Sequence, residues 1–185
     1  MAPVKLDVDQ LTKWPLPAIQ FTIGGVHVLK IVGISEMFVS RDPGDVIVTY
    51  SLGSCVGVAL YDPVAKAGGM IHCMLPLSKI DPQKASAKPC MFTDTGVTLL
   101  LQELFNLGAT RANLVIKVAG AASLLDEKGL FKIGERNYTV LRKVLWKNNL
   151  LIASEDVQGT ASRTLTLHMK DGRTTIKSAG REVEL

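Results

Sequence analysis

The segment VTYSLGSCVGV, residues 48–58, places a cysteine between two glycines in a stretch with the character of a β-strand. Alternate side chains of an extended chain share a face, which would group these small and polar residues: Thr49, Ser51, Gly53, Cys55 and Gly57. Small neighbours let a substrate approach a thiol, whereas a thiol in a packed core is walled in. A bend at Gly53-Ser54 would break the alternation but leave the thiol uncrowded. The segment therefore predicts a reachable cysteine within a β-sheet.

An imidazole follows in the next apolar run, GMIHCML, residues 69–75. Asp62-Pro63 turns the chain between the two runs, so a hairpin-like return would set His72 beside Cys55. A free thiol with a pKa of about 8.5 is only slightly ionised at neutral pH, and an imidazole can accept its proton and later protonate a leaving amine. Thr49 would hydrogen-bond the second ring nitrogen and fix the tautomer. Spacing alone leaves open the alternative that the cysteine and the histidine only pack.

The rest of the chain combines short strands with two amphipathic helices. Strands are predicted over 26–39, 46–60, 69–75, 113–119, 150–154, 164–169 and 173–177, helices over 93–108 and 134–146, and a loop over 78–91. Strands and helices do not alternate regularly, so we predict an α+β fold with packed mixed β-sheets covered by helices. Residues 1–22, interrupted by three prolines, are predicted to form an N-terminal arm, and residues 23–185 one domain.

Composition narrows the function classes. With 47% hydrophobic and 21% charged residues the chain is globular, and its 21 basic residues are scattered without an aromatic series, which argues against a nucleic-acid partner. No apolar stretch approaches a spanning helix and no secretory signal is visible, so we expect no membrane insertion and a cytoplasmic location. Cys55, Cys73 and Cys90 form no C-x-x-C pair and lack paired histidines, so we expect neither a disulfide framework nor a metal site.

Several separated stretches resemble, in order and across roughly residues 31–178, the chemoreceptor glutamine deamidase family, CheD. They are LGSCVGVALYDPVAKAGGMIHCMLP, FTDTGVTLLLQEL, IGERNYTVLRKVL and SEDVQGTASRTL. The resemblance implies that Cys55 is the nucleophile, His72 the acid/base and Thr49 the hydroxyl that orients it. It also implies a CheD-like cysteine hydrolase fold, with packed sheets inside and helices outside.

The activity that the resemblance implies is deamidation of glutamine side chains in chemotaxis receptors to glutamate, in some members with hydrolysis of glutamyl methyl esters. The reaction passes through a cysteine thioester without a cofactor. Backbone amides of the turn at Gly53 to Cys55 are the natural oxyanion donors, so we assign Gly53 and Ser54 to oxyanion or substrate binding. The implied partners are cytoplasmic domains of chemoreceptors and, in some members, a CheC-like phosphatase whose docking segment competes with the receptor.

Two positions depart from the family pattern, and two other functions stay open. Residues 118–121 read VAGA where the family usually has a Phe-Gly-Gly-Ala-like turn, and Gln158-Gly159 stands in place of a paired glycine. Either departure would alter a rim loop. One alternative is a chemotaxis adaptor that binds a CheC-like phosphatase with little catalysis; the other is a cysteine hydrolase of free amides or esters. Joint retention of Thr49, Cys55 and His72 argues against the adaptor.

Overall fold

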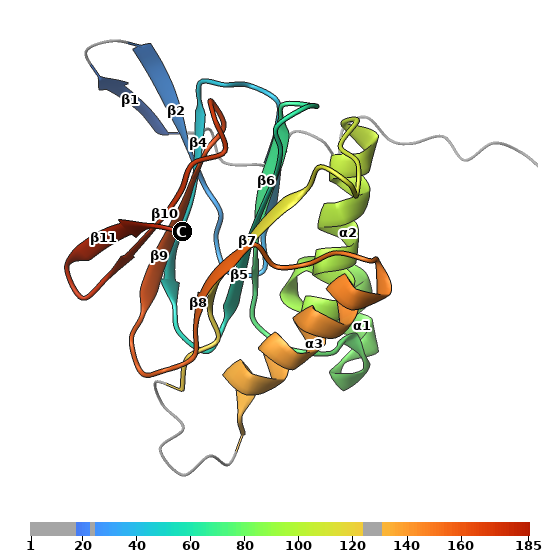
Figure 1. Ribbon diagram of the computed structural model, residues 1–185. Helices are drawn as coiled ribbons and strands as arrows, with labels where there is room; N and C mark the ends of the chain where they lie inside the picture. The colour runs from blue at the N-terminus through green and yellow to red at the C-terminus, as the bar shows by residue number, and fades with distance from the viewer. Residues whose placement is uncertain (1–17, 23–24, 124–130) are drawn as a thin grey trace, which may run out of the picture.

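The computed structural model describes residues 18–22, 25–123 and 131–185, which form two packed β-sheets and a helical layer (Figure 1). The six-stranded sheet contains, in spatial order, β1 (Ala18–Thr22), β2 (Gly25–Ile31), β4 (Asp45–Leu52), β9 (Arg163–His168), β10 (Thr174–Ser178) and β11 (Arg181–Glu184). The five-stranded sheet contains β3 (Met37–Ser40), β6 (Ala67–Cys73), β5 (Val56–Asp62), β7 (Val115–Gly120) and β8 (Ser154–Val157). Both sheets mix parallel and antiparallel pairs.

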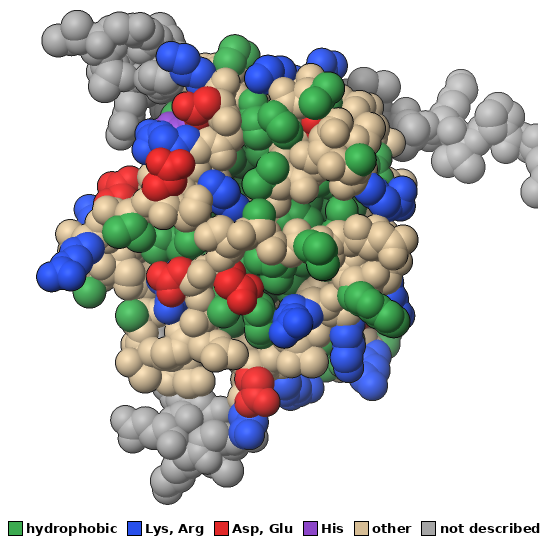
Figure 2. Space-filling view, viewed as in Figure 1, with side chains coloured by type: hydrophobic (Ala, Val, Ile, Leu, Met, Phe, Trp, Pro, Cys, Tyr) green, Lys and Arg blue, Asp and Glu red, His purple; other side chains and the backbone are tan. Residues whose placement is uncertain are grey.

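The helices α1 (Pro82–Ala87), α2 (Thr93–Asn106) and α3 (Ile133–Lys147) cover the face of the five-stranded sheet that is turned away from the other sheet (Figure 1). Short 3-10 turns at Ser78–Ile80 and Pro89–Met91 flank α1. The predicted α+β class, with packed mixed sheets covered by helices, is confirmed. Charged side chains on the helical side of the view in Figure 2 are mainly basic. Helix α3 has several exposed basic residues: Arg136, Arg142, Lys143 and Lys147.

Several predicted elements have different bounds in the structure. The strands predicted over 26–39 and 46–60 are each divided between the two sheets, because the apolar pattern continues through the point where the chain crosses. The predicted loop over 78–91 contains α1, whose first turn is capped by the Asp81 carboxylate, which accepts from the Lys84 N–H at 2.9 Å. The strand predicted over 150–154 lies at Ser154–Val157, since Leu150 packs in the core beneath the helices.

The two edge strands of the six-stranded sheet were not predicted. β11 pairs with β10, and β1 pairs antiparallel with β2. Residues 18–22, which we assigned to the N-terminal arm, thus extend this sheet, while the first 17 residues of the predicted arm lie outside the described residues. The domain boundary itself stays a prediction.

Strands β5 and β6 are buried on both faces, so alternate residues enter two different cores. Val58 and Ile71 face α2 and α3 in the helix-side core. Ala59 and Met70 face the six-stranded sheet in the inter-sheet core, where Leu165 of β9 also packs. Burial on both sides explains why these two strands read as nearly continuous apolar runs.

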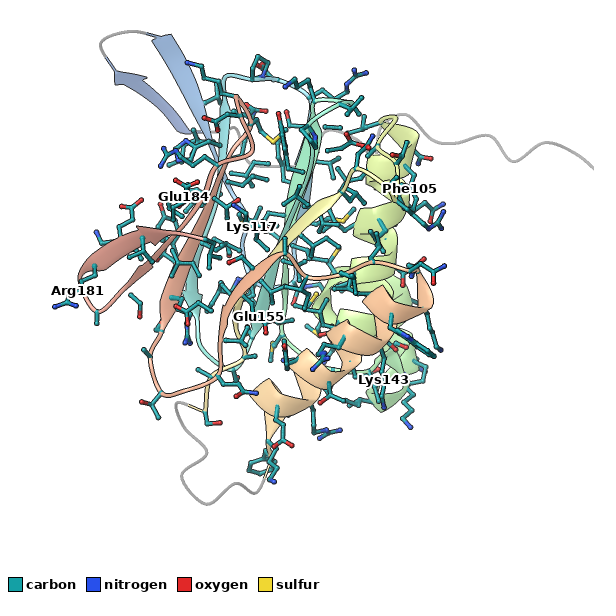
Figure 3. All side chains as sticks on the ribbon, in the orientation of Figure 1. Phe105, Lys117, Lys143, Glu155, Arg181 and Glu184 are labelled. Carbon is teal, nitrogen blue, oxygen red and sulfur yellow. The ribbon has the colours of Figure 1, made fainter. Side chains whose placement is uncertain are left out.

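The turn between β5 and β6 sets the register of this hairpin. Asp62 ends β5, and its carboxylate accepts hydrogen bonds from the N–H groups of Val64 and Ala65 at 2.8 and 2.9 Å. This agrees with the break predicted at Asp62-Pro63. At the neighbouring strand, Lys117 of β7 donates to the carbonyl of Leu185 and so ties the last residue to the inter-sheet core (Figure 3).

Candidate active site

The predicted site segment crosses from one sheet to the other. β4 ends in the six-stranded sheet, residues 53–55 span the gap, and β5 starts in the five-stranded sheet. A β-bulge precedes the crossing: the register with β9 shifts between Thr49 and Leu52, and Ser51 has a φ of 58°. Both Thr49 and Leu52 are therefore buried, while Tyr50 and Ser51 are exposed. The single face predicted from alternate residues after Thr49 is wrong.

Gly57 faces the interior and not an open surface, contrary to our expectation. A methyl group at this position would lie 2.6 Å from Cδ1 of Leu52 and 3.4 Å from Cδ2 of Leu165, so the sheets pack this closely only over glycine. The partner of Gly57 in β6 is His72, and opposed residues of an antiparallel pair share a face. His72 therefore faces the six-stranded sheet, while Cys73 packs in the helix-side core.

Thr49 holds the imidazole of His72 in one tautomer. The Thr49 hydroxyl lies 2.7 Å from the Val32 carbonyl and 2.7 Å from Nδ1 of His72. A carbonyl only accepts, so the single hydroxyl proton goes to Val32, and Thr49 must accept the proton that Nδ1 carries. The lone pair of His72 is thereby placed on Nε2, the nitrogen that can then take a proton from another group.

The Nε2 atom of His72 is buried and has no hydrogen-bond partner within the described residues. Loss of water lowers the pKa of His72 to about 4, because the charged imidazolium is disfavoured in the interior. His72 is therefore neutral at physiological pH. An unpaired buried nitrogen is unusual in a stable fold and suggests a site that is completed by a bound molecule.

Cys55 approaches the same inter-sheet space. It is half-buried, packs against the inter-sheet core and lies two residues before Gly57, whose partner across the hairpin is His72. Burial raises the pKa of the Cys55 thiol, and a contact with its own backbone N–H lowers it by less. Both groups are therefore neutral at rest, and the thiol has to lose its proton during attack rather than from a standing ion pair.

Each of three successive carbonyl groups of the crossing segment accepts a hydrogen bond. Gly53 accepts from the N–H of Ala122 at 2.8 Å, Ser54 from Nδ2 of Asn137 at 2.9 Å, and Cys55 from the N–H of Ala121 at 2.7 Å. The C=O and N–H groups of a trans peptide point in opposite directions, so the N–H groups of Ser54 and Cys55 point away from these donors. Within the described residues neither N–H has an acceptor beyond its own residue.

We assigned Gly53 and Ser54 to oxyanion or substrate binding. In the structure both residues make hydrogen bonds through their backbone carbonyl groups. The Ser54 hydroxyl makes no hydrogen bond to any described residue, so its side chain has no partner that would assign it a role. Paired backbone N–H groups that point to one side are the usual donors for a carbonyl oxygen that becomes negatively charged.

The first departure, Val118-Ala119, lies within β7, where Ala119 pairs with Gly57 and packs in the inter-sheet core. The next residue keeps the family's glycine and lies against the crossing segment. Gly120 has a φ of +98°, and a methyl group there would lie 2.4 Å from the Cys55 carbonyl oxygen. Gln158 donates its N–H to the Gly120 carbonyl at 2.9 Å and has a φ of 66°, a conformation that glycine adopts without strain. The departures therefore lie in the strand beside Gly57 and in the segment that hydrogen-bonds Gly120 behind the Cys55 turn, and not in a rim loop alone.

Asn137 was missed by the sequence analysis, which predicted an amphipathic helix over 134–146 without a polar residue on its buried face. Asn137 is 0% exposed, and its Nδ2 also donates to the carbonyl of Met74 at 3.0 Å. A polar residue one helical turn before a buried leucine was the available signal, because such a side chain must find partners inside the protein.

In the described ranges no three His, Cys, Asp or Glu side chains are grouped so that they could hold a metal ion. No helix among them is long and apolar enough to span a bilayer. The crossing segment and the strands beside it carry a half-buried thiol, a neutral imidazole oriented by a hydroxyl, and two backbone N–H groups without an acceptor in another described residue.

Comparison with known proteins gives consistent results. Residues 74–178 match the family model described as CheD chemotactic sensory transduction, a stretch that begins after Thr49, Cys55 and His72. A probable chemoreceptor glutamine deamidase CheD 1 of Syntrophus aciditrophicus is 48% identical over 150 residues, which are 81% of this chain and 94% of that protein. A probable chemoreceptor glutamine deamidase CheD of Solibacter usitatus is 46% identical over 155 residues, 84% of this chain and 92% of that protein.

The chemoreceptor glutamine deamidase CheD of Thermotoga maritima is 39% identical over 151 residues, 82% of this chain and 92% of that protein. A solved structure, the hypothetical protein YfiH of Bacillus licheniformis, matches with a TM-score of 0.40 and 13% identity over 67% of this chain and 50% of that chain, too distant to bear on function. The family model spans more than half of the chain and the relatives cover most of it, so the chain belongs to the CheD family.

Proposed function

We propose that this protein is a chemoreceptor glutamine deamidase in which Cys55 is the nucleophile, His72 the acid/base and Thr49 the residue that orients it. One observation carries this assignment: the Thr49 hydroxyl leaves the buried Nε2 of His72 with a lone pair and no described partner, at the crossing that bears Cys55. The names of the relatives, which describe chemoreceptor glutamine deamidases, support the same substrate.

In the first half of the reaction Sγ of Cys55 attacks the side-chain carbonyl carbon of a glutamine. The thiol proton passes to Nε2 of His72, the new S–C bond forms, and the carbonyl oxygen becomes an oxyanion. The N–H groups of Ser54 and Cys55 donate to this oxygen. The intermediate then collapses: the C–N bond breaks, His72 returns its proton to the leaving nitrogen as ammonia departs, and a thioester remains on Cys55.

In the second half a water molecule takes the place of the leaving ammonia. His72 is neutral again, accepts a proton from the water at Nε2, and the hydroxide attacks the thioester carbonyl. The S–C bond breaks, the proton returns to the sulfur, and the product is a glutamate side chain. The steps consume one water and involve only groups of this chain. A glutamyl methyl ester would follow the same path with methanol as the leaving group.

The buried neutral pair suits this chemistry. Raised pKa at Cys55 and lowered pKa at His72 both keep the site uncharged until a carbonyl is present. On attack, the imidazolium and the oxyanion form together. Thr49 then stabilises the positive charge on His72, and the backbone N–H groups stabilise the negative charge on the oxygen; neither charge exists at rest. The interactions are thus strongest in the transition state, as catalysis requires.

The partners in this proposal are the cytoplasmic domains of chemoreceptors, which places the reaction in the cytoplasm. A CheC-like phosphatase is a second partner, proposed from the family resemblance, and it would dock over the thiol. Because such docking would cover Cys55, the phosphatase should inhibit deamidation competitively with receptor. Tight binding of the phosphatase with unaltered receptor turnover would show that the two do not share a surface.

Receptor cytoplasmic fragments incubated with the protein test the proposal directly. Mass spectrometry should locate glutamines converted to glutamate, with matching ammonia release, and free glutamine and small amides run in parallel should turn over far more slowly. Cys55→Ala should abolish conversion, whereas the control Cys90→Ala, at another half-buried thiol, should leave it intact. Undiminished conversion by the folded Cys55→Ala protein would refute the catalytic assignment.

A further inference from the structure

Asn137 of α3 joins the two segments that carry the proposed reacting groups. Its Nδ2 donates to the carbonyl of Ser54, the residue before Cys55, at 2.9 Å, and to the carbonyl of Met74, two residues after His72, at 3.0 Å. Its side chain is fully buried. The side-chain amide of Asn137 therefore connects the crossing segment, which carries Cys55, to the residue after β6.

The orientation of this amide is determined by its partners. Two backbone carbonyls can only accept, so the NH2 group must face Ser54 and Met74. The oxygen, Oδ1, then faces the hydroxyl of Thr93, which lies 3.1 Å away and shares its single proton between Oδ1 and the Leu75 carbonyl, also at 3.1 Å. Both N–H donors and the carbonyl of Asn137 are thus engaged, and none of these groups is free to turn toward a substrate.

We propose that Asn137 is a positioning residue that turns the N–H of Cys55 toward the substrate oxygen. The Ser54 carbonyl and the Cys55 N–H belong to one planar trans peptide, so a donor that holds the carbonyl on the helix side points the N–H to the opposite side. Ala121 and Ala122 hold the two flanking carbonyls with backbone N–H groups, which do not depend on a side chain. The Ser54 carbonyl alone among the three depends on a side chain.

This inference deepens the proposed function and rests on it only in taking Cys55 to attack a carbonyl group. It predicts a selective defect. Without Asn137 the peptide between Ser54 and Cys55 can rotate, and the oxyanion loses a pre-aimed donor. Reactions of Cys55 that form an oxyanion should suffer, while reactions that form none should not.

Two reagents separate these cases on the intact protein. p-Nitrophenyl acetate acylates a thiol: the S–C bond forms through a tetrahedral oxyanion, the C–O bond breaks, nitrophenolate leaves, and the thiol proton passes to His72 and then to solvent. Iodoacetamide alkylates the same thiol by direct displacement of iodide, with no oxyanion. Both rates at Cys55 are followed in protein lacking the competing half-buried thiol, Cys90→Ala, with site occupancy checked by peptide mapping.

In Asn137→Ala we expect acylation of Cys55 to slow by about 10- to 100-fold, and alkylation to stay within about twofold of the parent. Asn137→Ser, whose hydroxyl can donate one hydrogen bond, is the gentler variant if the alanine protein does not fold, and it is judged by the same ratio. Thr93→Val, which frees Oδ1, should show a smaller loss of the same kind. Asn148→Ala removes an amide that donates only to Val144 of the same helix, and it should change neither rate.

Equal loss of both rates in a folded Asn137 variant would overturn the proposal and leave Asn137 as a purely structural residue; so would unchanged acylation. When receptor deamidation is measured on the same proteins, kcat should fall and KM should not rise. If the parent acylates and the ratio shifts as expected, but no receptor glutamine is converted, the proposed substrate is wrong while the role of Asn137 stands.

Discussion

Replacing Thr49 with valine tests the orientation of the proposed base with little change in shape. Valine keeps the volume and branching of threonine but removes the hydroxyl that links the Val32 carbonyl to Nδ1 of His72, both at 2.7 Å. Without an acceptor at Nδ1, the proton can move to Nε2, and a ring with Nε2–H cannot accept the Cys55 proton. The variant should therefore fold, bind substrate and turn it over slowly.

The size of the effect follows from the charge that develops on the ring. When His72 takes the thiol proton, Nδ1–H becomes the donor of a charged imidazolium, and such hydrogen bonds contribute about 1.5–3 kcal/mol. At about 1.4 kcal/mol per factor of ten, kcat should fall by about 10- to 100-fold. Stability should fall as well, by about 1–3 kcal/mol, because the buried carbonyl of Val32 loses its donor.

Ammonia release from receptor fragments measures kcat and KM, and 15N NMR of the imidazole reports which nitrogen carries the proton. Thr49→Ser is the matched control, because it restores the hydroxyl and removes only a methyl group; it should retain kcat within a few-fold and the Nδ1–H tautomer. The reasoning is refuted if Thr49→Val keeps both the parental kcat and the parental tautomer, since the hydroxyl would then do nothing for the base.

Three further predictions concern acid stability, the Cys55 turn and thiol labelling. The pKa of His72 is about 6.5 in an unfolded chain and about 4 in the folded protein, so the unfolded chain binds more protons and acid favours unfolding. As the pH falls from 6.5 to 4, the free energy of unfolding should therefore fall by roughly 3 kcal/mol. Denaturation curves of His72→Gln should lack this loss. Gly120→Ala should lower stability by more than about 1 kcal/mol in urea titrations and impair deamidation, because φ there is +98° and the methyl group meets the Cys55 carbonyl; normal activity would contradict this. Iodoacetamide should label Cys55 and Cys90 faster as the pH rises, because burial raises the pKa of both thiols. It should label the buried Cys73 only when the protein unfolds. A pH-independent labelling rate at Cys55 would reveal a standing ion pair.

The local pattern of the sequence determined much of the molecule. The break at Asp62-Pro63 and the apolar runs around it were enough to predict a hairpin that returns His72 toward Cys55, because turn chemistry and strand alternation act over a few residues. The same alternation places Cys73 on the face of β6 opposite to His72, and in the structure Cys73 packs in the helix-side core. The α+β class followed from the order of strands and helices alone.

Other features depend on contacts between distant segments, and a periodic pattern does not show them. An apolar run looks the same whether a strand stays in its sheet or crosses to the next, so the division of the stretch over 46–60 into β4 and β5 was hidden. The bulge after Thr49 also escaped, although it decides that Leu52 points inward and Ser51 outward, because it depends on the register with β9. Small edge strands such as β1 are stabilised by their neighbours and not by their own composition.

The candidate site likewise combines features that the local sequence predicts with features that depend on contacts between distant segments. Residue types and their order in the sequence were enough to name a thiol, an imidazole and a hydroxyl as candidates. Pairing of β2 with β4 gave the Thr49 hydroxyl a partner in the Val32 carbonyl, and the packing of the two sheets brought Nδ1 of His72 to the same hydroxyl, which fixes one tautomer. Asn137 became part of the site because α3 lies against the crossing segment, 83 residues away in the chain from Ser54. Chain-local chemistry determined which groups are available, and long-range hydrogen bonds, which require the folded sheets and helices to be in place, decided how those groups point.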